Sequence, residues 1–419
     1  MSVTDDTLNT LTAQWYNSLV TGLSLSAKDF QIAQGDLLVP SSTDRLWDMM
    51  DQIPVQSIAQ YYSSSAANTF SSDYNNLLSG LKESASEAFK TAMGTNYAAW
   101  QTAEQAYFAA NGPTIMANPP MSVSRALTTY FDEWSMVNMD PGLAASCYTL
   151  YAAIYQNPVY IGMLLIQHKP AGTPAAYTLT QSQLVSDLGH GPTQTFSMNS
   201  QTSSSDLTNS WTSSSSSEGG TYFYTNSSSS EATDFTQKFA TSNVTVSTTY
   251  QHVITAPVQA LSSGTATDDA GQALRAWFYP GALTAAYQDD TGDTWQDPTK
   301  WPEYFGPTGA LQYVVTGLIV VDGITTSVTS DATYTSDEQT YAHSEHHEGY
   351  GCWPYYVSHD DSSTTNSSST FDASGHMTTT TTSPVGNPVV IGVLVSAVKD
   401  IETVAEEAEA AEAEAEPAE

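Results

Sequence analysis

The sequence predicts an α+β protein: an N-terminal α-helical domain, followed by a mostly antiparallel β-sheet domain with two long Ser/Thr-rich β-ribbon arms. Three observations indicate this class. Apolar residues recur at helical spacing in the first part of the chain, short apolar runs rich in Val, Ile and Leu follow, and two long Ser/Thr stretches separate those runs. The expected segments are a helical domain at 1–156, a β-rich domain at 157–400, arms at 193–251 and 324–382, and an acidic Ala/Glu tail at 401–419.

Spacing and end signals place the helices of the first domain. Leu residues and a tryptophan recur every three or four residues over 8–23 and predict the first helix. Further helices are expected from residue 43 to the residue before Pro54, and at 73–93, 96–110, 122–136 and 141–155. The aromatic residues of this domain are expected to pack in its core, with a cofactor pocket as the alternative; they include Trp15, Trp47, Trp100, Tyr107 and Trp134.

Four apolar runs predict core strands in the second domain, at 159–166, 252–261, 311–321 and 389–395. The first and last open alike, with Asn-Pro-Val, and proline is tolerated at the first residue of a strand. Core strand, arm and core strand occur twice, so the layout looks duplicated. Between the two units, residues 268–279 carry apolar residues at helical spacing and predict a helix.

Each Ser/Thr stretch is expected to fold back on itself as a β-ribbon. Glycines lie near the middle of both, Gly219-Gly220 in the first and Gly349-Tyr350-Gly351 in the second, and glycine supplies the positive φ of hairpin turns. Aromatic residues recur along both stretches and proline is nearly absent, whereas flexible linkers, the alternative reading, seldom contain many aromatics. The sequence therefore favours ordered ribbons over linkers.

The charge balance excludes one class of function. The chain has 10 Lys and Arg against 44 Asp and Glu, a formal net charge of −34. Nucleic-acid binding needs a basic surface, so no nucleic-acid partner is expected, and anionic membranes would repel the chain at long range. The two cysteines are expected to be free thiols. No secretory signal is recognisable at the start, so a cytoplasmic location is expected, with release by a signal-less route left open.

The leading functional prediction is a non-enzymatic, self-associating structural or interaction protein that forms homo-oligomers through its arms. The arms carry little charge, with Lys238 as their one cation and Pro354 inside the second, and such ribbons leave strand edges that can pair between copies. Pore formation is the alternative: two strand–arm–strand units resemble in layout the membrane-attack-complex/perforin and cholesterol-dependent cytolysin families, in which two segments become transmembrane hairpins. No sequence signature of those families is present, and the arms lack the apolar alternation that membrane strands require, so a membrane partner is not favoured.

A histidine cluster in the second arm predicts a candidate metal site, and no other cofactor is expected. His346 and His359 would face each other across a ribbon turning near residues 352–353, close enough to share a zinc or copper ion. The neighbouring candidates are His343, His347, Glu345, Glu348 and Asp360. Catalytic motifs are otherwise absent from the sequence, so no enzymatic activity is expected.

Overall fold

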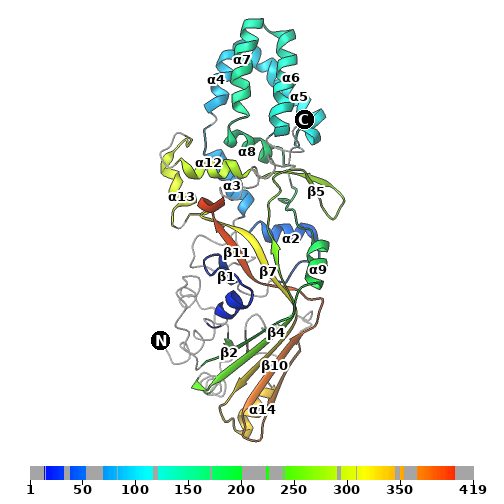
Figure 1. Cartoon of the computed structure of the whole chain (residues 1–419), viewed down its shortest axis with the longest axis vertical. Coiled ribbons are helices and arrows are strands. Elements are labelled where there is room, and N and C mark those ends of the chain that lie inside the picture. Colours follow the sequence, from blue (N-terminus) through cyan, green and yellow to red (C-terminus); the bar gives the residue numbers. More distant parts are fainter. Residues whose placement is uncertain are drawn as a thin grey trace, which may run out of the picture.

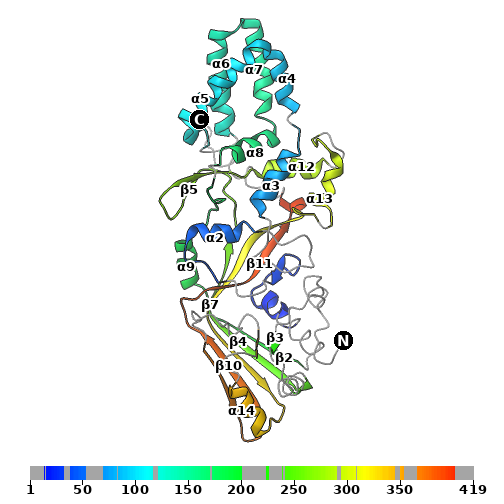
Figure 2. The same ribbon diagram turned by 180° about the vertical axis from the view of Figure 1, so that it is seen from behind.

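The protein is mixed α+β, as predicted. The computed structural model describes residues 14, 16–32, 38–52, 69–82, 84–116, 121–169, 172–200, 223–225, 238, 241–289, 294–307, 309–344, 350–352 and 366–401. The molecule is elongated, with a helical bundle at one end and a long curled sheet at the other (Figure 1). A layer of shorter helices lies between the two and is visible from both sides (Figure 2).

Helices account for most of the first half of the chain. Their bounds are α2 Thr43–Met50, α3 Phe70–Ser79, α4 Ser84–Met93, α5 Tyr97–Ile115, α6 Met121–Asn138, α7 Pro141–Ile154, α8 Pro158–Gln167, α9 Gln181–Gly189, α12 Pro280–Gln288, α13 Trp301–Phe305 and α14 Ser336–Ser344. Helices α4 to α7 form the end bundle, while α3, α8 and α12 lie in the intermediate layer (Figure 1).

The helices expected at 43–53, 96–110, 122–136 and 141–155 are confirmed as α2, α5, α6 and α7. The single helix expected at 73–93 is instead divided into α3 and α4. The chain between them runs beside a distant segment, where the Lys82 amide donates to the Thr294 carbonyl at 2.7 Å and Leu81 bridges to Trp295. This tertiary contact breaks the helix after Gly80.

The strand expected at 159–166 is wrong, because this run is helix α8. The Asn157 side chain accepts a hydrogen bond from the Val159 amide at 2.9 Å and caps the helix, and Pro158 occupies the first turn, where proline is tolerated. Helix α8 packs against α12 and α3. The duplicated layout expected from sequence is therefore not duplicated in structure, since its first unit opens with a helix.

The helix expected at 268–279 is also wrong. Strands β5 (Thr265–Thr267) and β6 (Ala273–Arg275) form a small hairpin there, and α12 begins only at Pro280. The turn between the strands is closed by the Asp268 carboxylate, which accepts from the Gln272 amide at 2.7 Å, and by Gly271 at φ +80°. The turn that Asp268 and Gly271 favour therefore forms in place of the helix that the apolar spacing predicts.

The remaining strands build one large antiparallel sheet and a small strand pair. Their bounds are β1 Phe30–Ile32, β2 Gln194–Asn199, β3 Phe223–Thr225, β4 Val244–Pro257, β7 Tyr313–Ser330, β8 Tyr350–Cys352, β9 Asn366–Phe371, β10 Met377–Ser383 and β11 Val389–Ala397. Strand β7 is central. One of its edges pairs with β4, and the other pairs first with β11 and then with β10. Strand β1 extends the sheet beyond β11, β9 extends it beyond β10, and β2 extends it beyond β4. The runs expected at 252–261, 311–321 and 389–395 thus lie largely in strands.

The sheet changes character along β7 at Asp322 and Gly323. Before this point the strand is apolar and buried, and after it Ser and Thr dominate. Gly323 has φ +63°, and a Cβ there would lie 2.8 Å from both Gln251 Cβ and Val385 Cγ2. The buried Asp322 carboxylate accepts from the amides of Gly323 at 2.8 Å, Gly386 at 2.8 Å and Asn387 at 3.1 Å. It thereby holds the segment at which β10 gives way to β11.

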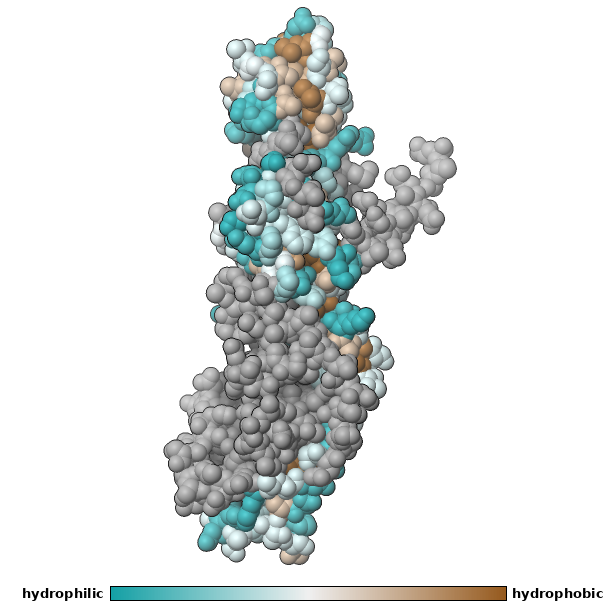
Figure 3. All heavy atoms as spheres, turned by 90° about the vertical axis from the view of Figure 1, so that its left-hand side faces the viewer, coloured by the Kyte–Doolittle hydropathy of each residue, from teal (hydrophilic) through white to brown (hydrophobic). Residues whose placement is uncertain are grey.

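The free end of the helical bundle carries exposed apolar side chains. Met136 and Val137, near the end of α6, are 71% and 84% exposed. Apolar residues gather on this end of the molecule, in contrast to the polar residues around them (Figure 3). The bundle tip is therefore a second surface, separate from the sheet, where a contact with another molecule could form.

A buried carboxyl group near the sheet should make stability depend on pH. Asp73 in α3 is 8% exposed, and none of the described residues donates a hydrogen bond to its Oδ2. Burial, reinforced by the negative charge of Asp51, raises the pKa of Asp73 to about 6. Because the folded state holds this proton more tightly than the unfolded chain, the protein should lose stability as the pH rises from about 4 to 6.

We expect the Asp73→Asn variant to be more stable than the wild type at pH 7, by about 1–2 kcal/mol after allowance for solvent screening. Its stability should also fall less than that of the wild type between pH 4 and 6. Urea denaturation at several pH values measures both. Asp187→Asn, which neutralises an exposed carboxylate on α9, is the matched control and should behave like wild type. Parallel pH curves for wild type and Asp73→Asn would contradict the prediction.

Candidate interaction surface

The two Ser/Thr stretches contribute neighbouring strands to one sheet, rather than two separate ribbons. Within the first arm β2 pairs with β4, and within the second β7 pairs with β10, as the ribbon prediction requires. The two ribbons then join because β4 also pairs with β7 along its whole Ser/Thr-rich part. The resulting strand order in this half of the sheet is β2-β4-β7-β10-β9.

One face of this five-stranded region consists almost wholly of hydroxyl side chains. Three rows run across the strands in register: Asn199-Thr245-Thr329-Thr378-Thr370, Ser197-Ser247-Ser327-Thr380-Ser368 and Thr195-Thr249-Thr325-Thr382-Asn366. Of these fifteen positions thirteen are Ser or Thr and two are Asn, and all are exposed or half-buried. We call this set the hydroxyl face. It presents no charge and no apolar side chain.

Cross-strand hydrogen bonds order the hydroxyl face. Thr195 and Thr249 lie with their Oγ1 atoms 2.9 Å apart, the Ser327 and Thr380 hydroxyls are 3.1 Å apart, and so are those of Thr329 and Thr378. Side chains directly opposite each other on paired strands stabilise a sheet, and threonine pairs do so by hydrogen bonding. The face is thus held in one register by its own side chains.

The opposite face is buried and less uniform. Here Val246 and Val328 lie in one row with Thr379 and Ser369, whose hydroxyls are 2.8 Å apart. The next row pairs Thr248 with Thr326 at 3.0 Å. All these residues are buried, so every hydroxyl must find a partner, and the paired threonines and serines provide one for each other.

The two outer edges of this region differ. At β2, the Gln14 side-chain nitrogen donates to the Asn199 carbonyl at 2.7 Å and its oxygen accepts from the Asn199 amide at 2.9 Å, so Gln14 occupies part of that edge. At β9, no described strand pairs with the edge that faces away from β10. Strand β9 (Asn366–Phe371) contains neither charge nor proline, the two devices that usually prevent edge-to-edge pairing. Among the described strands of this region, β9 therefore has an unpaired edge to which another strand can add.

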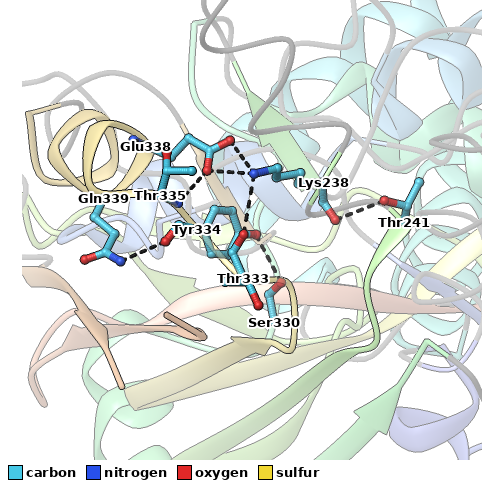
Figure 4. A network of polar contacts seen from close by, with 8 residues as sticks. All are labelled: Lys238, Thr241, Ser330, Thr333, Tyr334, Thr335, Glu338 and Gln339. Carbon is cyan, nitrogen blue, oxygen red and sulfur yellow. Dashed lines mark hydrogen bonds and ion pairs between the residues drawn. The ribbon is translucent and has the colours of Figure 1, made fainter. Parts of the chain in front are cut away.

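A polar network ties the first arm to the second near this edge (Figure 4). The Lys238 ammonium lies 2.6 Å from Glu338 Oε1, joining the first arm to helix α14 of the second. Glu338 also accepts from the Thr335 amide at 2.7 Å, while Thr335 Oγ1 accepts from the Glu338 amide at 3.3 Å, which is a capping box. Burial favours a higher pKa for Glu338, but its bonds to Lys238 and Thr335 hold the pKa below its ordinary value.

The same network reaches the sheet through Tyr334, which precedes the capping box. Its hydroxyl lies 3.0 Å from Ser330 Oγ, which is also 2.8 Å from Ser242 Oγ in the first arm. Its ring contacts Phe371 of β9 at 5.9 Å between centroids. Strand β9 is therefore anchored from one side. This network was not predicted from the sequence, although the Thr335-x-x-Glu338 pattern is typical of a capping box.

A further link joins the arms where the sequence predicted a turn. Tyr350 and Gly351 lie in strand β8, which pairs antiparallel with β3 of the first arm, Phe223 opposite Cys352 and Thr225 opposite Tyr350. The turn expected at Gly349-Tyr350-Gly351 is therefore wrong for its last two residues. The corresponding turn of the first arm, Gly219-Gly220, lies outside the described residues.

The predicted metal ligands lie mostly outside the part of the chain that the structure describes. His346, His347, His359, Glu345, Glu348 and Asp360 are outside it, and His343 lies in α14 with its side chain undescribed. Among the described residues no group of His, Cys, Asp and Glu side chains could hold a metal ion. The predicted zinc or copper site stays a prediction. Cys147, buried in α7, is a free thiol as expected.

Comparison with known proteins gives no relative: no protein-family model, no curated protein and no solved structure matches this chain. A search of the described helices finds none that combines the length and the apolar character needed to cross a bilayer.

Proposed function

We propose that this chain is a non-enzymatic, self-associating structural or interaction protein, and that copies join through the open edge of β9. The observation that carries the proposal is that the hydroxyl face ends at an uncharged edge strand. A second strand added to β9 gains main-chain hydrogen bonds and continues the hydroxyl rows with like residues. No charge or proline of β9 opposes that pairing.

Two properties of the chain favour pairing between like copies. The five-stranded region is already ordered by its own side-chain hydrogen bonds and by the Lys238–Glu338 ion pair, so association orders few further groups. The net charge of −34 opposes close approach of two copies at long range, whereas the hydroxyl face bears none of it. We therefore expect association to strengthen as added salt screens the remaining charge.

Introducing two lysines into the edge strand should weaken self-association at least about tenfold, because charged residues block edge pairing. The test variant is Ser368→Lys with Thr370→Lys. The control is Thr245→Lys with Ser247→Lys, which changes the same two rows of the hydroxyl face on β4, a strand paired on both sides. Light scattering after size-exclusion chromatography, over a range of protein concentrations, measures the oligomeric state.

The outcomes separate the possible interfaces. A wild-type protein that stays monomeric at high concentration contradicts the proposal outright. Equal weakening by both pairs of lysines points to stacking of hydroxyl faces rather than edge pairing. Loss of association only in a Met136→Lys, Val137→Lys variant points to the bundle tip. Weakening by the edge lysines alone supports the β9 interface.

A further inference from the structure

The helical bundle holds a small polar cavity that is independent of the sheet. It lies where α4, α5 and α7 meet α8, and its volume is about 260 Å³. Its walls include the aromatic rings of Tyr97, Trp100, Tyr151 and Tyr160 and the carboxylate of Glu104. No Lys, Arg or His is among the residues that line it. A cavity of roughly 150 Å³ can hold benzene, so this one is large enough for a small organic ligand.

The aromatic walls are fixed by mutual packing. The rings of Trp100 and Tyr151 meet edge-on with centroids 5.2 Å apart, and Tyr155 meets both Tyr151 and Tyr160 edge-on at 5.0 and 5.3 Å. The faces of aromatic rings carry partial negative charge and attract cations. One wall already does so at its outer side, where the Lys90 ammonium lies 5.9 Å from the centroid of the Tyr97 ring.

Glu104 supplies a carboxylate to this aromatic cavity. Its Oε1 atom accepts hydrogen bonds from the hydroxyls of Tyr151 and of Tyr155, the latter at 3.0 Å. None of the described residues donates to Oε2, and no Lys or Arg pairs with the carboxylate. Burial raises the pKa of Glu104 although the two tyrosine bonds oppose this. A nearby cation would favour the ionised carboxylate and so offset the cost of its burial.

We propose that this cavity binds a small organic ammonium compound. Glu104 Oε2 would accept from the ammonium group, and the aromatic walls would contact its positive charge and alkyl part. An anion would meet the Glu104 charge with no compensating cation on the wall. The overall charge of −34 adds to the preference, because it raises the local concentration of cations around the protein.

Titration calorimetry on the full chain tests the proposal with ethylammonium and tetramethylammonium as probes. Propanol and propionate serve as the neutral and anionic counterparts. We expect saturable binding of an ammonium probe and none of propionate. Glu104→Gln should weaken binding at least about tenfold, because it removes the charge while keeping an acceptor for Tyr151 and Tyr155. Glu133→Gln, an exposed change on α6, is the matched control and should bind like wild type.

A second variant keeps the test decisive if Glu104→Gln fails to fold. Leu164→Phe adds bulk to the α8 wall of the cavity and should abolish binding while the protein keeps its helical circular dichroism. The proposal is overturned if no ammonium probe binds, if propanol binds as tightly as ethylammonium, or if a folded Glu104→Gln variant binds like wild type. None of these outcomes depends on self-association, because Glu104 lies in the helical bundle and not at the edge of β9.

Discussion

Replacement of Asp322 by alanine is expected to lower the free energy of unfolding by about 3 kcal/mol. The buried carboxylate accepts from three backbone amides, those of Gly323, Gly386 and Asn387. Alanine leaves these three amides without an acceptor. They lie at the point along β7 where its partner strand changes from β11 to β10. Hydrogen bonds to a charged group contribute more than neutral ones, so this should be among the largest effects of any polar substitution in the sheet. Urea denaturation followed by circular dichroism measures the loss.

Asp331→Ala is the matched control for this change. Asp331 follows β7 in the same sheet but is exposed and accepts from a single amide, that of Asn243, at 2.8 Å. We expect it to lose about 1 kcal/mol or less. Asp322→Ala should in addition become open to proteolysis at 384–388, the segment that the carboxylate holds. Equal stabilities for the two variants, with no new cleavage, would show that Asp322 does not fix this junction.

Replacement of Gly162 by alanine is expected to destabilise the protein by about 1–3 kcal/mol, although alanine favours helix formation over glycine by about 1 kcal/mol. Gly162 lies inside α8, and a Cβ there would approach Tyr74 Oη to 2.6 Å and Ala282 Cβ to 2.7 Å. The packed neighbours in α3 and α12 leave no room for a methyl group. Thermal or urea unfolding of the variant provides the measurement.

Gly189→Ala serves as the control for the effect of helix propensity. Gly189 is the exposed last residue of α9, and a Cβ there would meet nothing within 4 Å. This substitution should be neutral or slightly stabilising. A Gly162→Ala variant as stable as wild type would mean that α3 and α12 can move away from α8 far enough to admit a methyl group.

The two Asn-Pro-Val segments show the limit of local sequence. Both were expected to open strands, yet the segment at residue 157 begins helix α8 and the segment at residue 387 begins strand β11. Tertiary contacts decide which of the two structures each segment adopts. Gly162 brings α8 against Tyr74 and Ala282, whereas Gly392 leaves space in β11 for the Phe30 ring of β1, which a Cβ would approach to 2.3 Å. The same Asn-Pro-Val sequence therefore begins a helix in one place and a strand in the other, because different partners pack against the residues that follow it.

The candidate interaction surface was predictable in part. Ser and Thr content with scarce proline indicated ordered β-ribbons, and the paired ends of both arms confirm them. The joining of the arms was not predictable, because it depends on contacts between residues far apart in sequence. Lys238 and Glu338 are one hundred positions apart in the sequence. The pairings of β4 with β7 and of β3 with β8 also join distant segments, which no local sequence pattern can predict. The position of β9 at the edge of the described sheet follows from that strand order.

What the sequence by itself determined is the α+β class, most helices of the first 156 residues, three of the four apolar core strands and the hydroxyl character of the arms. These follow from spacing, capping and composition, which act over a few residues. Only the tertiary structure decided that the arms form one sheet, that β9 has an edge with no partner among the described strands, and that Glu104 lines an aromatic cavity. Those features arise from register and packing between distant segments, where burial and shape, rather than local preference, select one arrangement.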